Sequence, residues 1–333
     1  LSIVLAFEEL IMKTEKTEKF RLVTRSDFDG LVCAVLLKKM GIIDDIKFVH
    51  PKDMQDGKVA ISANDITTNL PFVEGVHLAF DHHLSETIRN KGKRDNHIID
   101  PSAPSAARVV YRHYGGEKTF PAAWNEMMDA VDKGDSAQYG INEILNSRGW
   151  ALMNFIMDAR TGLGRFKEFR ISNYQLMMEL IEKCISLSID EIIALPDVQE
   201  RVQLFQKHAE LAKEQIQRCS TVHENLVLLD LRDEETIYAV NRFMIYALYP
   251  ACNMSIHVMW GLKQQNTVFA IGSSIVNRSS TVNIGELCLA YGGGGHRNAG
   301  TCQVANEVAG KTLNEIIQKI HAKSLTPVGA GKV

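Results

Sequence analysis

The segment FRLVTRSDFDGLVCAVLLKKM, residues 20–40, decides the fold of the first half of the chain. It opens with the alternation of a strand, continues through a polar turn that ends at Gly30, and closes with an apolar run typical of a buried helix at residues 31–40. Further strands are predicted at residues 46–49, 59–63 and 76–80. Strands that alternate with helices predict an α/β domain whose largely parallel sheet has helices on both faces.

The second half of the chain has a different pattern. A long helix with a polar face is predicted from Pro196 to about Ser220, and a new set of strands follows at residues 226–230, 256–260 and 267–273. At 333 residues the chain also exceeds the length at which a single core usually stops growing. We therefore predict a first domain at residues 18–197, a connecting helix at 198–220 and a smaller α/β domain at 221–325.

The composition limits the classes of partner. With 45% hydrophobic and 23% charged residues the chain is an ordinary globular protein, and its net charge is −3. Proteins that hold long nucleic acid usually carry a basic surplus, so we expect no long double-stranded partner. A short anionic substrate in a local basic pocket remains compatible. Six scattered cysteines without a C-x-x-C pair favour a reduced, cytoplasmic protein.

The sequence predicts no membrane association, because no run approaches about 18 apolar residues. The apolar opening LSIVLAF, residues 1–7, is followed at once by Glu8 and Glu9 and has no basic region before it. We therefore do not interpret it as a signal peptide.

The cluster SDFDG, residues 26–30, follows the first strand and opens a helix. Asp27 and Asp29 can point their carboxylates at one or two cations, and such hard oxygen ligands suit Mn²⁺ or Mg²⁺. A plain helix N-cap explains the same pattern equally well when the cluster is taken alone.

The cluster FDHHLSE, residues 80–86, also follows a predicted strand. Adjacent histidines at such a position have little reason to exist for packing. One imidazole, His82, can ligate a cation while His83 contacts a phosphate oxygen, and Asp81 can orient a ring. A chance pair of surface histidines is the alternative.

Two further carboxylate positions are candidates. Asp65 follows the predicted strand 59–63 and could bridge two cations, although an ordinary Asx turn explains it when it is taken alone. Asp135 or Asp132, near the end of a predicted helix, could also be a ligand, and a plain helix C-terminus is the alternative. Four such clusters at element ends of one α/β domain favour a two-cation carboxylate site over four coincidences.

The second domain contains YGGGGHRNAGT, residues 291–301. A run of glycines loses much conformational entropy on folding, so we expect it to let the backbone approach a ligand with its N–H groups facing an anion. His296 and Arg297 add donors for phosphate. Arg278, in the polar segment after the strand 267–273, is a second candidate, and a solvated loop explains that segment about equally well.

These clusters, in this order, resemble those of the DHH/DHHA1 phosphoesterase family, whose members include nanoRNases, RecJ-type exonucleases and exopolyphosphatase-like proteins. The resemblance extends from about Phe20 to Val304, and the segment after Asp100, residues 101–105, also looks like the family's. It implies a metal-binding DHH domain, a smaller substrate-binding DHHA1 domain and an active site in the cleft between them.

Carried over by motif, the resemblance implies a role for each candidate. The implied metal ligands are Asp27, Asp29, Asp65, His82 and Asp135, with Asp132 as the substitute for Asp135. The implied catalytic residues are Asp81, His83 and Arg25, and the implied substrate-binding residues are Gly293, Gly294, Gly295, His296, Arg297 and Arg278.

One position departs from the family pattern. Many members have a histidine four residues before the first motif aspartate, where this chain has Val23, and RecJ-type members have an aspartate where this chain has Arg25. A ligand of the first cation is therefore absent. Either that cation binds more weakly, or Arg25 takes its place and contacts phosphate directly.

The implied reaction is an in-line attack on phosphorus by a metal-activated water, with Mn²⁺ as the expected cofactor, as one or two ions, and with Mg²⁺ or Co²⁺ compatible. Short oligoribonucleotides or dinucleotides are the expected substrates. Two alternatives stay open: an exopolyphosphatase-like hydrolase of phosphoanhydrides, and a nucleotide-sensing protein without catalysis. A homodimer is compatible with family precedent.

Overall fold

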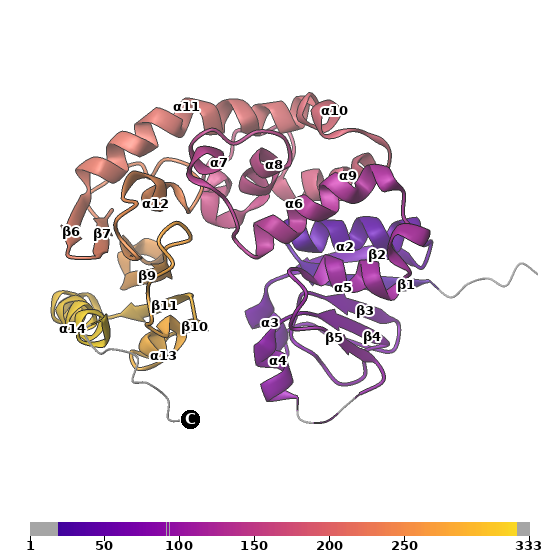
Figure 1. The fold of residues 1–333 in the computed structure, drawn as a ribbon, viewed down its shortest axis with the longest axis horizontal. Helices are drawn as coiled ribbons and strands as arrows, with labels where there is room; N and C mark the ends of the chain where they lie inside the picture. Colours follow the sequence, from indigo (N-terminus) through magenta and orange to yellow (C-terminus); the bar gives the residue numbers. More distant parts are fainter. Residues whose placement is uncertain (1–18, 91, 93, 325–333) are drawn as a thin grey trace, which may run out of the picture. The chain divides into compact units, whose positions relative to one another are not determined.

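The computed structural model describes residues 19–90, 92 and 94–324, which form two compact units (Figure 1). The first unit holds residues up to 137 together with residues 149–157 and 168–199, and the second holds residues 138–148, 158–167 and those from 200 onward. The predicted domain ends at residues 18 and 325, and the apolar opening at residues 1–7, lie outside the described residues.

The first unit is built on a five-stranded sheet with the strand order β2-β1-β3-β4-β5, in which every pair is parallel. Its strands are β1 (Phe20–Arg25), β2 (Ile43–Val49), β3 (Asp65–Thr68), β4 (Leu78–Asp81) and β5 (His97–Ile99). The prediction of an α/β domain with a parallel sheet is therefore confirmed.

One face of this sheet is covered by α2, whose residues from Phe28 to Leu37 are all buried. A helix that is buried on every side belongs in a core, and α2 packs against β1, β2 and three other helices. Gly30 makes the close approach to β1 feasible, because a Cβ there would lie 1.9 Å from the carbonyl oxygen of Arg25. The helices of this layer are α2 (Phe28–Lys39), α5 (Ala106–His113), α6 (Asn125–Asp135) and α9 (Asn173–Ser186).

The opposite face is covered by α3 (Pro51–Gln55) and by loop residues. Val23 and Val49 of the sheet form a cluster there with Met54 of α3 and Leu70. Successive strand residues point to opposite faces, so the sheet is covered on both sides as predicted. The remaining helices of this unit are α4 (Leu84–Arg89), α8 (Gly149–Met157) and α10 (Ile189–Ile193), with short 3₁₀ turns at Gly116–Lys118 and Ala122–Trp124.

The predicted strand at residues 59–63 is wrong, because β3 begins only at Asp65. The apolar side chains of Val59 and Ile61 instead pack onto the Val23 cluster, outside the sheet. The chain then turns at Ser62, whose backbone N–H donates to the Asp65 carboxylate at 2.7 Å. An apolar run that covers a sheet is indistinguishable from a buried strand by periodicity alone.

The second unit contains a six-stranded mixed sheet with the order β10-β11-β9-β8-β7-β6, in which only β7 and β8 pair in parallel among the described strands. The strands are β6 (Ser220–His223), β7 (Leu226–Asp230), β8 (Met254–Trp260), β9 (Thr267–Ser273), β10 (Gly294–His296) and β11 (Ala299–Val304). The second α/β pattern predicted after Ser220 is thus confirmed.

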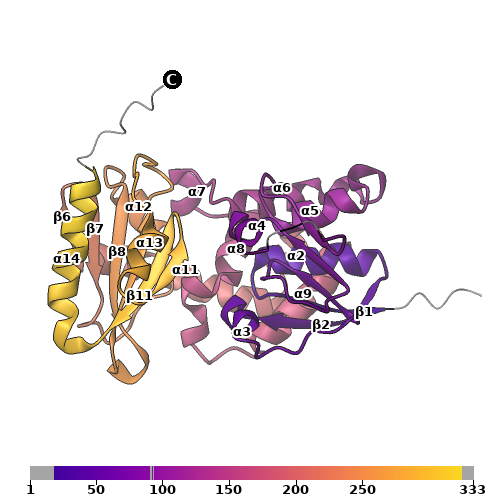
Figure 2. The ribbon, with the colours of Figure 1, turned by 90° about the horizontal axis from the view of Figure 1, so that it is seen from below.

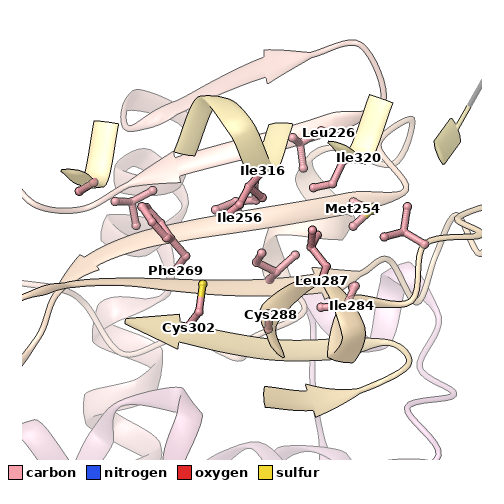
Figure 3. Packing of buried hydrophobic residues seen from close by; sticks show 14 residues of the cluster. Leu226, Met254, Ile256, Phe269, Ile284, Leu287, Cys288, Cys302, Ile316 and Ile320 are labelled. Atoms are coloured by element: carbon pink, nitrogen blue, oxygen red, sulfur yellow. The ribbon is translucent and has the colours of Figure 1, made fainter. Parts of the chain in front are cut away.

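The core of this unit joins the sheet to α13 (Ile284–Leu289) and α14 (Asn306–Ser324). Figure 3 shows Ile256 and Phe269 of the sheet in the same cluster as Leu287 and Ile316 of the helices. In Figure 2, α14 runs alongside the strands of the sheet. The buried side chains that join these elements exclude water, which favours folding of the unit.

The long helix α11 spans Pro196–Arg218, and the chain makes its last passage from the first unit to the second within it. Residues 138–148 and 158–167, which the predicted first domain includes, belong to the second unit. The second unit also has α7 (Ile141–Leu145), α12 (Met244–Leu248) and 3₁₀ turns at Ala159–Thr161, Leu163–Arg165 and Leu262–Gln264. None of the helices in the described residues is both long and apolar enough to cross a lipid bilayer.

The glycine run forms a hairpin, β10–β11, that packs against α13. A Cβ at Gly293 would lie 2.1 Å from the carbonyl oxygen of Thr301, and one at Gly295 would lie 2.3 Å from that of Ala299. These two glycines are therefore required by the fold itself, which the sequence did not predict. Gly294 is exposed, and a Cβ there would meet nothing within 4 Å.

This difference predicts opposite effects for two neighbouring substitutions. Gly293→Ala should lower the free energy of unfolding by roughly 2 kcal/mol, because backbone atoms must move to admit the methyl group. Gly294→Ala should leave it nearly unchanged. Urea denaturation of the two variants checks the comparison, and equal stabilities would contradict the described packing of the hairpin.

Candidate functional site

Polar residues gather where the strands of the first unit end. Arg25 and Asp27 lie at the end of β1, Asn69 follows β3, and His82 and His83 follow β4. These strands are neighbours and parallel, so their carboxyl ends meet at one edge of the sheet (Figure 1). Ligands of open α/β sheets bind at this edge.

Three side chains converge beside this edge. Asp29, His82 and Asp135 each offer one ligand atom, and these atoms all lie within 4.8 Å of one another. Within residues 19–90, 92 and 94–324, no other group of three acidic, histidine or cysteine side chains meets this spacing. Two carboxylates and one imidazole form a ligand set that suits Mn²⁺ and related divalent cations.

Asp29 lies in the first turn of α2 and is only 2% exposed. Its two oxygens accept hydrogen bonds from the backbone N–H groups of Ala106, at 3.0 Å, and Ala107, at 2.7 Å. Burial, together with repulsion from Asp135, raises the pKa of Asp29 to about 7, although the charge of His82 opposes the shift. A bound cation would relieve this penalty on the charged form.

His82 is oriented by the segment after β5. Its Nδ1 lies 3.2 Å from the carbonyl oxygen of Ala103, which fixes the proton on Nδ1 in the neutral ring and leaves Nε2 as the ligand atom. Nε2 is buried and lies 3.0 Å from Oδ2 of Asp135, but without the geometry of a hydrogen bond. A divalent cation held by these residues would satisfy both atoms, so the residues present fit a metal ion.

In the absence of a cation, burial lowers the pKa of His82, but the adjacent carboxylate of Asp135 outweighs burial and raises this pKa to about 9. For Asp135, burial raises the pKa and the contact with His82 outweighs it, so the pKa is lowered. Asp135 ends α6, and Asp132, one turn earlier, is held by Ser105 and Arg108. Of the two predicted alternatives, the structure brings Asp135 into the cluster and not Asp132.

Asp27 lies outside this three-residue cluster. It caps α2 by accepting the backbone N–H of Gly30 at 3.0 Å, and its Oδ2 forms an ion pair with Nε of Arg25 at 2.9 Å. The amide of Asn69 also donates to Asp27, at 3.5 Å. Asp27 is therefore an N-cap that holds a guanidinium at the carboxyl edge of β1.

Asp81 and His83 form a second pair. Asp81 is 1% exposed, and its Oδ1 lies 2.7 Å from Nδ1 of His83 and accepts the backbone N–H of His82 at 2.9 Å. Burial lowers the pKa of His83, but the hydrogen bond to Asp81 outweighs burial, so the pKa is raised. His83 is thus a half-buried ring whose protonated form is favoured.

Asp65 does not lie with the other candidate ligands. It begins β3 and pairs with Arg21 at 2.6 Å, at the amino edge of the sheet. Thr68 ends the strand three residues later, which puts Asp65 roughly 10 Å from the carboxyl edge. The prediction that Asp65 bridges two cations is corrected, because it rested on the wrong strand at residues 59–63.

The residue at the carboxyl end of β3 is Asn69, which sequence reasoning missed. It is 1% exposed, has a left-handed backbone with φ of 55°, and its Oδ1 is buried without a hydrogen-bond partner. The signal that could have found it is the run Ile66–Thr68, a β-branched strand that ends in a residue tolerant of this conformation.

The predicted substrate-binding residues all belong to the second unit. Of those in the hairpin β10–β11 and its turn, Gly294, Gly295, His296 and Arg297 are exposed, and Gly293, just before β10, is partly buried. Arg278 lies in the segment after β9, is exposed, and donates from Nε to the carbonyl oxygen of Ile275 at 3.1 Å. Their roles stay predictions.

No family model matches the chain, and neither does any curated protein. Among solved structures, the pGpG-specific phosphodiesterase PggH from Vibrio cholerae is 65% identical, with a TM-score of 0.81, and the match covers 92% of this chain and 100% of that one. The chain belongs to the DHH/DHHA1 phosphoesterase family. It is a hydrolase of phosphodiester bonds in a family of metal-dependent enzymes.

Two more distant structures share the fold of this phosphoesterase. RecJ from Thermus thermophilus in complex with Mn²⁺ is 12% identical with a TM-score of 0.52, covering 96% of this chain and 54% of that one. A manganese-bound exonuclease RecJ is 13% identical with a TM-score of 0.50, covering 97% and 94%. At such identities the likeness concerns the fold alone.

Replacing Asp65 should leave cation binding intact and should destabilise the fold. Asp65→Ala leaves Arg21 without its carboxylate and should lower the free energy of unfolding by about 2 kcal/mol, since one partner of a largely buried pair is removed. Affinity for Mn²⁺ should stay within about twofold. Denaturation and calorimetric titration measure the two effects, and a lost cation site in a fully stable variant would contradict this assignment.

Cation binding should strengthen as pH rises. Below about pH 7 both Asp29 and His82 carry a proton that the cation must displace, and between about pH 7 and 9 only His82 does. The apparent affinity for Mn²⁺ should therefore rise by up to about tenfold per pH unit for each displaced proton. Calorimetry at pH 6 and pH 8 in buffers of different ionisation enthalpy counts these protons; an affinity independent of pH would disprove the prediction.

Proposed function

We propose that the enzyme hydrolyses pGpG, or a closely similar short linear dinucleotide, to mononucleotides. The observation that carries the proposal is the 65% identity to a pGpG-specific phosphodiesterase over that protein's whole length. The cluster of Asp29, His82 and Asp135 supports it, because it supplies the cation ligands that such a hydrolase needs. The negative net charge also disfavours a long nucleic acid substrate.

The proposed site holds a single divalent cation, Mn²⁺ being the preferred one, through Asp29, His82 and Asp135. When bound, the cation supplies Lewis-acid chemistry that activates water and neutralises charge on phosphate oxygens. A second cation lacks ligands in this proposal, because Asp65 lies at the other edge of the sheet and Asp27 is paired with Arg25.

Arg25 and His83 supply the remaining positive charge in the proposed reaction. Arg25, which is held by Asp27, binds a non-bridging phosphate oxygen and stabilises the charge that develops there. His83, whose ring is held by Asp81, donates a hydrogen bond from its other nitrogen to a phosphate or leaving oxygen. Each group is oriented by a carboxylate behind it, so neither needs to reorganise during the reaction.

The second unit is proposed to bind the rest of the dinucleotide. His296, Arg297 and Arg278 offer donors for phosphate and base, and Gly294 has neither a positive φ nor a steric need to be glycine. An exposed glycine without a structural reason favours close approach of a ligand to the backbone. A cytoplasmic location and a homodimer remain predictions.

The deciding experiment is a turnover assay with Mn²⁺ on four substrates: pGpG, a longer RNA, adenosine bisphosphate and polyphosphate. Asp135→Asn should abolish turnover, while Asp65→Asn, which changes a buried carboxylate at the other edge of the sheet, should retain it. Mononucleotides released from pGpG alone support the proposal. Phosphate released from polyphosphate points to the exopolyphosphatase alternative. No turnover of any of the four substrates points to a nucleotide-sensing protein without catalysis.

Arg25 should matter for chemistry and not for holding the cation. Arg25→Ala should lower kcat by about 100-fold, the loss typical of a donor that stabilises transition-state charge. Affinity for Mn²⁺ should not fall, because Asp27 loses its partner and no cation ligand is removed. Steady-state kinetics and calorimetry measure the two quantities, and an unchanged kcat would exclude Arg25 from the reaction.

A further inference from the structure

A single segment after β5 contacts two of the three cation ligands. The carbonyl oxygen of Ala103 lies 3.2 Å from Nδ1 of His82 and so selects the tautomer that leaves Nε2 for the cation. Three residues later, the backbone N–H groups of Ala106 and Ala107 donate to the two oxygens of Asp29. The position of this segment therefore sets the orientation of both ligands.

Ser105, between these contacts, is fully buried and has two partners. Its Oγ accepts the backbone N–H of Arg108 at 3.0 Å, which caps α5, and donates to Oδ1 of Asp132 at 2.6 Å. The guanidinium of Arg108 reaches back to the same carboxylate, with Nε 2.6 Å from Oδ2. Ser105, Arg108 and Asp132 thus form a closed network of hydrogen bonds.

The third ligand is tied to the same network through α6. Asp132 lies one turn before Asp135, which ends that helix. Because residues three apart lie on the same side of a helix, fixing the carboxylate of Asp132 fixes the last turn that presents Asp135. The helices α5 and α6 also pack directly against one another.

We infer that Ser105, Arg108 and Asp132 are positioning residues that hold all three cation ligands in register, although none of the three belongs to the ligand cluster. The inference rests on the proposed cation site and adds a role for residues that the reaction itself does not use. Groups that orient metal ligands typically contribute 10- to 100-fold in affinity. The sequence had offered Asp132 as a substitute ligand, and this network gives it a different role.

The main test compares two serines that each act as the N-cap of a helix. Ser105 and Ser172 each cap a helix of the first unit, and Ser172 caps α9 by accepting the backbone N–H of Gln175. Ser105→Ala should weaken Mn²⁺ binding on the order of 10-fold or more. Ser172→Ala should leave the affinity unchanged, although it also removes a cap. Calorimetric titration of Mn²⁺ and thermal denaturation without metal are measured for both.

A second set of variants tests whether the residues act together. Asp132→Asn keeps an acceptor for Ser105 but loses the charge facing Arg108, so it should weaken binding less than Asp132→Ala. The double variant of Ser105→Ala and Asp132→Ala should bind Mn²⁺ about as tightly as whichever single variant binds it less tightly. The reason is that losses of binding free energy do not add for residues of one hydrogen-bond network. Fully additive losses would overturn the inference.

The outcomes separate this inference from the proposed function. If the unaltered protein binds no Mn²⁺, or if Asp135→Ala binds it normally, the proposed cation site itself fails. If the site binds Mn²⁺ but Ser105→Ala and Ser172→Ala show the same affinity, only the positioning role fails. If Ser105→Ala does not fold, the Asp132→Asn and Asp132→Ala pair still decides, since an affinity equal to that of the unaltered protein in both would overturn the inference.

Discussion

The burial of the Asp29 carboxylate is the constraint around which the first unit is arranged. A carboxylate removed from water is unstable unless hydrogen bonds and positive charge compensate it. Asp29 receives two backbone N–H groups from the start of α5 and the nearby ring of His82, yet its pKa is still raised to about 7. The compensation inside the protein is therefore incomplete, and under the proposed function a divalent cation completes it.

The parallel sheet explains how residues distant in sequence come to surround this carboxylate. The strands β1 and β4 both end at the same edge, which places the turn that carries Asp29 beside His82. The helices α5 and α6 pack on α2, which brings the amides of α5 and the carboxylate of Asp135 to the same place. Each contact uses the end of an element, where backbone groups lack partners within the element.

Much of this arrangement could be predicted from the sequence, since motifs at the ends of strands pointed to Asp29 and His82, and a motif at the end of a helix pointed to Asp135. Asp65 could not be placed correctly, because the apolar run before it covers the sheet and looks like a strand. Asn69 was missed because it stands out by its left-handed backbone conformation and its burial. Neither property can be read from the identity of a short polar residue in the sequence. The network through Ser105 depends on tertiary packing of two helices, which periodicity does not encode.

The two aspartates of one turn have different environments, and this difference places two kinds of positive charge at the site. Asp27 is half-buried and holds the guanidinium of Arg25, a positive charge that is covalently part of the chain. Asp29 is buried, and in the proposed site an exchangeable cation offsets its charge. Under the proposed function, a phosphate that reaches this edge meets one permanent and one exchangeable positive charge. In the proposed reaction the fixed guanidinium takes the place of a second ion, so hydrolysis does not require a ligand at position 23, where this chain has Val23.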